Sequence, residues 1–135
     1  MHIQPTREQL EALRATAGGG PVVMLNLLRF RNEADYSASP ELAPAEPISG
    51  SGAYRRYEEH VSHLLSSFGG ELVFAGHAQA SVIGPEDEQW DVVLLVRYPD
   101  VETFLRFTND EDYLAGVGHR TAALEDSRLV PLTQR

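Results

Sequence analysis

The sequence predicts an α+β fold, with helices packed on a four-stranded antiparallel sheet, because an order of strand, helix and strand occurs twice within 135 residues. The apolar runs VVMLNLLRF and DVVLLVRY begin the two halves, and the polar segment GPEDEQ forms a hairpin between them. In chain order, the strands and helices are expected at residues 22–30, 54–68, 71–83, 90–98, 101–108, 110–124 and 128–132. This βαββαβ order is typical of the ferredoxin-like sandwich.

A separate helix is expected before this unit, so the chain divides into an N-terminal helical extension (1–20) and one domain (21–135). Thr6 and Gln9 have the spacing of a capping box, and three glycines end the helix before Pro21. Residues 32–50 contain three prolines and predict a long loop without regular structure. Loops of this length are commonly lids, oligomer contacts or disordered inserts, and the sequence does not choose among them.

Local signals position the remaining elements. The helix of the first half has the clearest periodicity, formed by Tyr54, Tyr57, Val61, Leu64, Leu65 and Phe68. Gly76 suggests a bulge in the second strand or a close approach of another backbone segment, and Asp100 can cap the next helix. Asn109 or Asp110 can cap the last helix, which we expect to be interrupted by the glycines at 116 and 118. Pro131 predicts that the last strand lies at an edge of the sheet.

The two strongest strands are apolar on both faces, whereas the strands of a sheet with one solvated face usually alternate apolar and polar residues. The first strand has no polar face around Asn26, and residues 92–96 are all aliphatic. If helices cover one face, the other remains as an apolar surface of the kind that marks an interface. We therefore expect a homodimer in which the sheets pack face to face.

Composition excludes several classes of function. Twenty acidic residues against eleven basic ones give a net charge of −9, which disfavours nucleic acids and anionic membranes as partners. The chain has no cysteine, so thiolate metal sites and cysteine nucleophiles are excluded. All eleven basic residues are arginine, so Schiff-base enzymes and P-loop proteins are excluded as well. The start of the chain lacks the pattern of a signal peptide, and we expect a cytoplasmic protein.

Four segments carry a family resemblance: PVVMLNLLRFR, SGSGAYRRYEEHV, VIGPEDEQWDVVLLVRYP and HRTAALEDSRL. They are similar to segments of the family called domain of unknown function 1330, within the dimeric α+β barrel superfamily, and the resemblance covers roughly residues 20–133. Relatives by fold include cofactor-free quinone-forming monooxygenases, muconolactone isomerases, haem-degrading monooxygenases and chlorite dismutase-like proteins. The resemblance implies a cavity between sheet and helices, but it transfers no catalytic residue.

Polar residues within apolar elements are the candidates for a site. Asn26 interrupts VVMLNLL, and a buried amide needs hydrogen-bond partners, which a ligand could supply. The alternative is a bond to the backbone. Trp90, at the start of the third strand, could form a wall of the same cavity or pack in the core or the dimer interface. Tyr57 could offer its phenol to a ligand, although its spacing is also that of a core residue.

Two arginines and two histidines complete the candidate site. Arg29 and Arg97 lie near the carboxyl ends of the first and third strands, which we expect to run side by side in the same direction. Together they could hold a carboxylate or an enolate, or they could pair with acidic residues. His119 and His77 could each act as a general base, because imidazole titrates near neutral pH, or be structural.

A second pair of histidines, three residues apart on the first main helix, is better explained by a solvated helix face. His60 and His63 are surrounded there by charged residues and do not by themselves make a metal site.

The leading hypothesis is an enzyme without an organic cofactor or metal, which acts on a small aromatic or enolisable metabolite as a monooxygenase or isomerase. Asn26 would polarise the substrate, His119 or His77 would move a proton, and Arg97 would hold negative charge. The competing hypothesis is a non-catalytic ligand-binding or interaction module. A haem protein is a minor alternative, because Asn26, Trp90 and His119 are the residue types that haem-degrading relatives combine.

Overall fold

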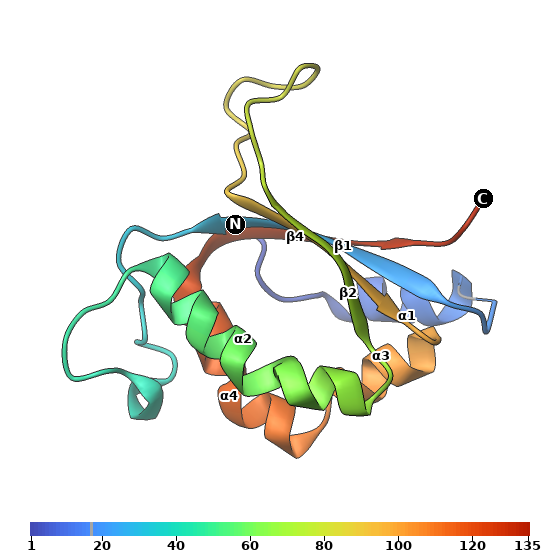
Figure 1. Ribbon diagram of the computed structural model, residues 1–135, viewed down its shortest axis with the longest axis horizontal. Coiled ribbons are helices and arrows are strands. Elements are labelled where there is room, and N and C mark those ends of the chain that lie inside the picture. The colour runs from blue at the N-terminus through green and yellow to red at the C-terminus, as the bar shows by residue number, and fades with distance from the viewer. Residues whose placement is uncertain (17) are drawn as a thin grey trace.

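The computed structural model, which describes residues 1–16 and 18–135, confirms the ferredoxin-like α+β fold. A four-stranded sheet has the order β2-β3-β1-β4, and every pair of neighbouring strands is antiparallel. Figure 1 shows the helices together on one side of this sheet. The elements are α1 (Arg7–Thr16), β1 (Val22–Phe30), the 3-10 helix η1 (Pro40–Leu42), α2 (Gly50–Ser67), β2 (Glu71–His77), β3 (Val92–Tyr98), α3 (Val101–Thr108), α4 (Glu111–Ala123) and β4 (Leu124–Leu132).

The predicted helix caps are confirmed by hydrogen bonds. The Thr6 amide donates to the Gln9 side chain, and the Gln9 amide donates to the Thr6 hydroxyl, as in a capping box. The Asp100 carboxylate accepts from the Thr103 amide at the start of α3. At the start of α4, Asp110 rather than Asn109 is the cap, with its carboxylate accepting from the Asp112 amide.

Two predicted boundaries in the second half of the chain are wrong. α4 runs without interruption because its glycines make room for neighbours: a Cβ on Gly116 would lie 2.1 Å from the ring of His60, and one on Gly118 would lie 2.6 Å from the hydroxyl of Ser39. β4 begins at Leu124 and not at Arg128, since the chain turns directly from α4 into the sheet.

The second strand also differs from the expectation. It ends at His77 instead of residue 83, because the chain leaves the sheet there as a long hairpin. The bulge lies between Leu72 and Phe74, whereas Gly76 is paired regularly with Val93. β4 is an edge strand, as its proline predicted.

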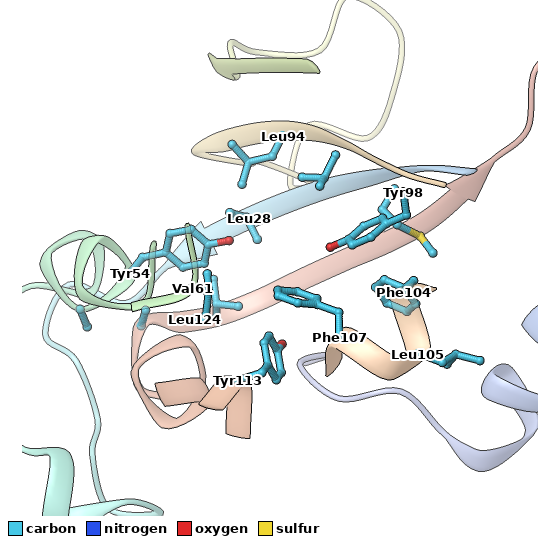
Figure 2. Close-up of a cluster of buried hydrophobic side chains, with 14 of the residues drawn as sticks. Leu28, Tyr54, Val61, Leu94, Tyr98, Phe104, Leu105, Phe107, Tyr113 and Leu124 are labelled. Carbon is cyan, nitrogen blue, oxygen red and sulfur yellow. The ribbon is translucent and has the colours of Figure 1, made fainter. Parts of the chain in front are cut away.

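The core lies between the sheet and the helices. Alternate residues of β1, Val22, Met24 and Leu28, point toward the helices and are fully buried. Below them, aromatic side chains from the end of α2, from β3 and from α4 pack at ring-centroid distances of 4.9–5.9 Å around Phe107 of α3. Figure 2 shows Tyr98, Phe107 and Tyr113 of this group. α1 contacts α3, and its leucines pack against the same core.

The opposite side of the sheet is called the open face here. By alternation and strand register it presents Val23, Leu25, Leu27, Phe74, Val93, Leu95, Val130 and Leu132. Among the described helices, none lies on this side in Figure 1. The expectation of a sheet with one uncovered apolar face is therefore correct for the single chain.

Residues 31–49 form a loop that is held in place by hydrogen bonds. Of the alternatives left open by the sequence, a disordered insert does not describe this loop. The Asp35 amide donates to the Ala122 carbonyl, and the Ala34 amide donates to the Ile48 carbonyl. The Tyr36 hydroxyl is 2.7 Å from Nδ1 of His119 on α4. The loop therefore packs along the outside of α4 and carries η1 with it.

None of the helices within residues 1–16 and 18–135 has both the length and the apolar character that crossing a lipid bilayer would require.

Candidate functional site

A pocket of about 530 Å³ lies where three segments meet: the end of β1, the start of α2, and the join between β2 and β3. The segments bring together one arginine, one histidine, one aspartate, one asparagine and two serines. The lining residues are Phe30, Arg31, Asn32, Ser49, Ser51, His77, Ala78, Asp91 and Val92. These groups include donors, acceptors and a cation, so the pocket has the composition of a site for a small polar ligand.

Arg31 is the strongest indication of a ligand. Its Nε atom is fully buried, yet it has no hydrogen-bond partner among the residues that the structure describes. The backbone of Arg31 is fixed, since its amide donates to the Ala123 carbonyl and its carbonyl accepts from the Gly50 amide. An unpaired buried donor costs about 1–3 kcal/mol, so a native structure rarely keeps one without a reason.

The start of α2 faces the same pocket. Ser49 caps this 18-residue helix, with its hydroxyl accepting from the Gly52 amide, and the Ser51 hydroxyl lies 3.2 Å from that of Ser49. The N-terminus of a helix carries a partial positive charge. Arg31 and the start of α2 therefore give this end of the pocket a positive potential.

His77 and Asp91 line the pocket from the end of β2 and from the residue just before β3. His77 is the last residue of β2, and it is exposed. Asp91 holds the strands together, because its carboxylate accepts from the Phe30 amide at 2.8 Å and its own amide donates to the Leu28 carbonyl. Asp91 therefore has a structural role, whereas the exposed side chain of His77 remains available to a ligand.

Asn26 and Tyr57 lie elsewhere, in the layer between sheet and helices. The amide of Asn26 points to the helix side and donates to the Met24 carbonyl at 3.2 Å, which is the backbone bond of the alternative reading. The Tyr57 hydroxyl donates to the Tyr113 hydroxyl at 3.3 Å. Burial, and then the neighbouring phenols of Tyr113 and Tyr54, raise the pKa of Tyr57 well above its usual value. Figure 2 shows Tyr54 and Tyr98 with their hydroxyls directed toward each other in this layer.

His119 does not reach Asn26, because it lies where α4 meets the loop of residues 31–49. Its Nδ1 is occupied by the Tyr36 hydroxyl. Desolvation, followed by the positive charges of Arg56 and His60, lowers the pKa of His119 below 6.5. Near neutral pH the ring is therefore held in its neutral form, as a structural partner of the loop.

The expectation for Arg29 and Arg97 is wrong. β1 and β3 are antiparallel neighbours, because the β2–β3 hairpin reverses the chain, so the two arginines lie at opposite ends of the sheet. Arg97 is opposite Val23, which places it on the open face and not on the side of Asn26. Asn26, His119 and Arg97 therefore do not converge on one pocket.

Trp90 is also on the open face. The guanidinium carbons of Arg29 and Arg128 lie 5.6 and 5.0 Å from the centre of its ring, and both arginines project from that face. Asn26 points to the other side of the sheet. The combination of Asn26, Trp90 and His119 that suggested a haem site is thus divided between two faces and a helix surface.

Of the residues predicted for the site, His77 alone lines the 530 Å³ pocket. Arg31, Asn32, Ser49 and Ser51 were missed. Ser49 is a residue type that favours the cap of a helix, but the sequence expectation began this helix at residue 54, four residues after its first residue, Gly50. Ser49 lies 18 residues after Arg31 in the chain, and no local sequence pattern predicts that the two residues are close in space.

Comparisons with known proteins agree with the fold. Two crystal structures of one protein of unknown function from Rhodopseudomonas palustris, one of them of the methylated protein, are each 37% identical to this chain. Their TM-scores are 0.89 and 0.86; each covers 99% of this chain, and the matches span 95% and 97% of the crystallised chains.

More distant structures share the fold alone. A dimeric protein of unknown function with a ferredoxin-like fold from Bacteroides fragilis has 14% identity and a TM-score of 0.51, with 84% of this chain and 95% of that chain covered. No curated protein matches. The family model described as "Domain of unknown function (DUF1330)" matches residues 43–132, so the chain belongs to the DUF1330 family.

Proposed function

We propose that this protein is a homodimer that binds a small organic carboxylate in the pocket between β1, α2 and the β2–β3 join, and that His77 exchanges a proton with the ligand. The observation that carries the proposal is Arg31, which lines that pocket and whose buried Nε has no hydrogen-bond partner within residues 1–16 and 18–135. Guanidinium groups hold carboxylates through paired hydrogen bonds, and a turn of the side chain toward a bound carboxylate would also give Nε a partner and offset the cost of the unpaired donor.

The charge distribution of the pocket supports an anionic ligand. Arg31 and the N-terminus of α2 lie at the same end, and both favour negative charge. Asp91 also lines the pocket, with its carboxylate held at the Phe30 amide, so its negative charge stays at that side and would orient the ligand carboxylate toward Arg31. A volume of about 530 Å³ is within the usual range for small-molecule sites.

Proton transfer is assigned to His77 because an imidazole can act as a general base and because this exposed side chain lines the pocket. For a 2-oxo acid, the step breaks a C–H bond next to the carbonyl carbon. The proton passes to the imidazole, and the electron pair moves to the carbonyl oxygen as an enolate. Return of the proton to carbon completes an isomerisation or an exchange.

Homodimer formation is supported by the open face, which carries apolar side chains from all four strands. A surface of this kind is usually an interface in a soluble protein. Sheet against sheet in a two-fold dimer buries both copies of it at once.

A ligand-binding module without catalysis is the second candidate. It is favoured by Asn26 and His119, whose polar atoms already have partners in Met24 and Tyr36. In this case the pocket would bind its ligand and His77 would have no chemical role.

The binding proposal is tested by thermal shift with a panel of small monocarboxylates, 2-oxo acids and inorganic phosphate. We expect selective stabilisation by a carboxylate, since a ligand that binds the folded state raises the melting temperature. Arg31→Leu should abolish the shift. Arg7→Leu removes the same charge from an exposed position on α1 and should preserve it. Equal shifts in both variants, or no shift with any acid, would refute the anion site.

Catalysis is tested by deuterium incorporation. A 2-oxo acid that binds is incubated in D2O with the protein, and loss of the signal of its C–H protons is followed by proton NMR. Enzyme-dependent exchange that His77→Ala removes and His63→Ala, at an exposed position of α2, retains would support the enzyme. Binding without exchange would leave the module as the function.

A further inference from the structure

The hairpin between β2 and β3 stands away from the rest of the molecule. We call residues 78–91 the arm; Figure 1 shows it rising from the sheet on the side opposite the helices. Near its tip, Val82 is 100% exposed and Ile83 is 95% exposed. Two adjacent large aliphatic side chains in full contact with water are unfavourable for a free loop, so the tip is expected to be covered in the assembled protein.

The base of the arm is held firmly. The Ala78 amide donates to the Asp91 carbonyl at 3.0 Å, which continues the ladder of β2 and β3 by one step. Nε of Arg29 donates to the Gln89 carbonyl at 2.9 Å, while Arg29 and Arg128 lie over the ring of Trp90. The direction of the arm is thus fixed before any partner binds, which lowers the entropic cost of binding.

The arm is long enough to pass a second sheet stacked on the open face. Val82 follows the end of β2 by five residues, which span up to about 17 Å when extended. Two sheets packed face to face lie about 10 Å apart. The tip would therefore extend beyond the plane of the second sheet and lie beside its edge.

One edge region offers a matching apolar surface. On β2, Leu72 and Val73 are 51% and 52% exposed, beside the bulge and at the opposite end of the strand from the arm. β4 forms the other edge of the sheet. At the end from which the arm rises, this edge carries the acidic residues Glu125 and Asp126 instead. In a face-to-face dimer, a two-fold axis that lies between the sheets and runs perpendicular to the strands places the arm of one copy beside the far end of β2 of the other. The apolar tip of the arm then meets the apolar side chains at that end of β2.

We propose that the arm clasps a second copy of this chain, with the Val82–Ile83 tip packed on Leu72 and Val73 of the partner subunit. This proposal rests on the open-face dimer of the proposed function and adds the arm to that interface. The arm carries acidic residues and no basic ones between positions 78 and 91, which disfavours insertion of the tip into an anionic membrane.

Cross-linking tests the contact directly, because the natural chain has no cysteine. Ile83→Cys chains are mixed with Val73→Cys chains of a different mass and oxidised. We expect a mixed disulfide that contains one chain of each kind. Pairing of Ile83→Cys with Glu8→Cys, on the exposed part of α1, is the control. A yield of mixed disulfide no higher than with this control overturns the proposal.

The energetic test uses the double variant Val82→Ser, Ile83→Ser in analytical ultracentrifugation. The substitutions leave the single chain intact because neither side chain is buried in it. Removal of four aliphatic contacts from a two-fold dimer should raise the dissociation constant about 100-fold. A double variant that dimerises as tightly as the natural chain refutes the clasp but leaves the open-face dimer standing.

Two further outcomes refute the clasp in other ways. A natural chain that is monomeric refutes both the clasp and the open-face dimer, whereas binding of carboxylates to the pocket is measured independently. Sedimentation of the natural chain with phosphatidylcholine vesicles, lost in the double variant, would show that the tip binds lipid and would also overturn the proposal.

Discussion

Gly50→Ala is the substitution whose effect follows most directly from the geometry of the candidate site. Gly50 is the first residue of α2, and it is buried where the end of β1 and the end of α4 cross. A Cβ at this position would lie 2.2 Å from the Arg31 carbonyl oxygen and 2.7 Å from the Ala123 carbonyl oxygen. Both neighbours are backbone atoms, so the clash cannot be relieved by rotation of a side chain.

The magnitude follows from what must move. To reach an ordinary contact distance, the start of α2 has to shift away from Arg31, which weakens the bond from the Gly50 amide to the Arg31 carbonyl and the bond from the Arg31 amide to the Ala123 carbonyl. Two hydrogen bonds at about 1 kcal/mol each and about 1–3 kcal/mol of overpacking outweigh the gain of at most about 1 kcal/mol from the better helix propensity of alanine. We expect the free energy of unfolding to fall by about 3 kcal/mol.

Urea unfolding followed by circular dichroism measures this value, and the melting temperature should fall by about 10 °C. Gly52→Ala is the matched control, because its Cβ would meet only the Ser49 hydroxyl at 3.2 Å and the Ile48 side chain at 3.9 Å. It should change stability little. If Gly50→Ala were as stable as Gly52→Ala, the close crossing that positions Arg31 would be refuted.

Three shorter predictions concern other parts of the molecule. Because burial lowers the pKa of His119, the unfolded chain binds more protons at this residue than the folded chain. The stability advantage of the natural chain over His119→Gln should therefore shrink as the pH falls from about 8 to about 5 in urea titrations, and an advantage that stays constant over this range would contradict the burial. Phe107→Ala removes the centre of the aromatic core and should cost about 3–4 kcal/mol by denaturant unfolding, with Phe107→Leu costing less than half; equal costs would contradict the packing. Trp90→Ala should accelerate amide hydrogen exchange in residues 79–88 and not in α2, and unchanged exchange would show that the arginine contacts do not hold the arm.

The fold could be predicted because its signals are local. Thr6 with Gln9, Asp100 and Asp110 each begin a helix through a side chain that bonds to an amide two or three residues away. The apolar faces of the strands are equally local, since alternation along a strand decides which residues share a side. The ends of β2 and β4 were misjudged, because where a strand stops depends on its partner strand.

The glycines of α4 show why local rules fail at contacts. Gly116 is a poor helix residue by itself, and the sequence expectation treated it as a break. The structure keeps the helix whole, because only a residue without a side chain leaves room for the ring of His60, whose Nε2 is 2.6 Å from the Asp112 carbonyl. Packing between α2 and α4 therefore decides the identity of this residue.

The candidate site was the least predictable feature. His77 was one of several candidate histidines, and Arg31 and Ser51, which line the same pocket, come from segments 46 and 26 residues away in the chain. Arg29 and Arg97 were paired through an assumed direction of β3, which the β2–β3 hairpin reverses. A single wrong strand direction moves a side chain to the other end of the sheet.

The order of the elements, the helix caps and the presence of a sheet that is apolar on both faces follow from short stretches of the chain, because each depends on residues within a few positions of one another. Which polar residues share a pocket, which face stays open and where the arm points are known only from the folded chain. Those relations depend on strand direction and on backbone crossings such as that of Gly50 with Arg31, and they arise only when distant segments pack together.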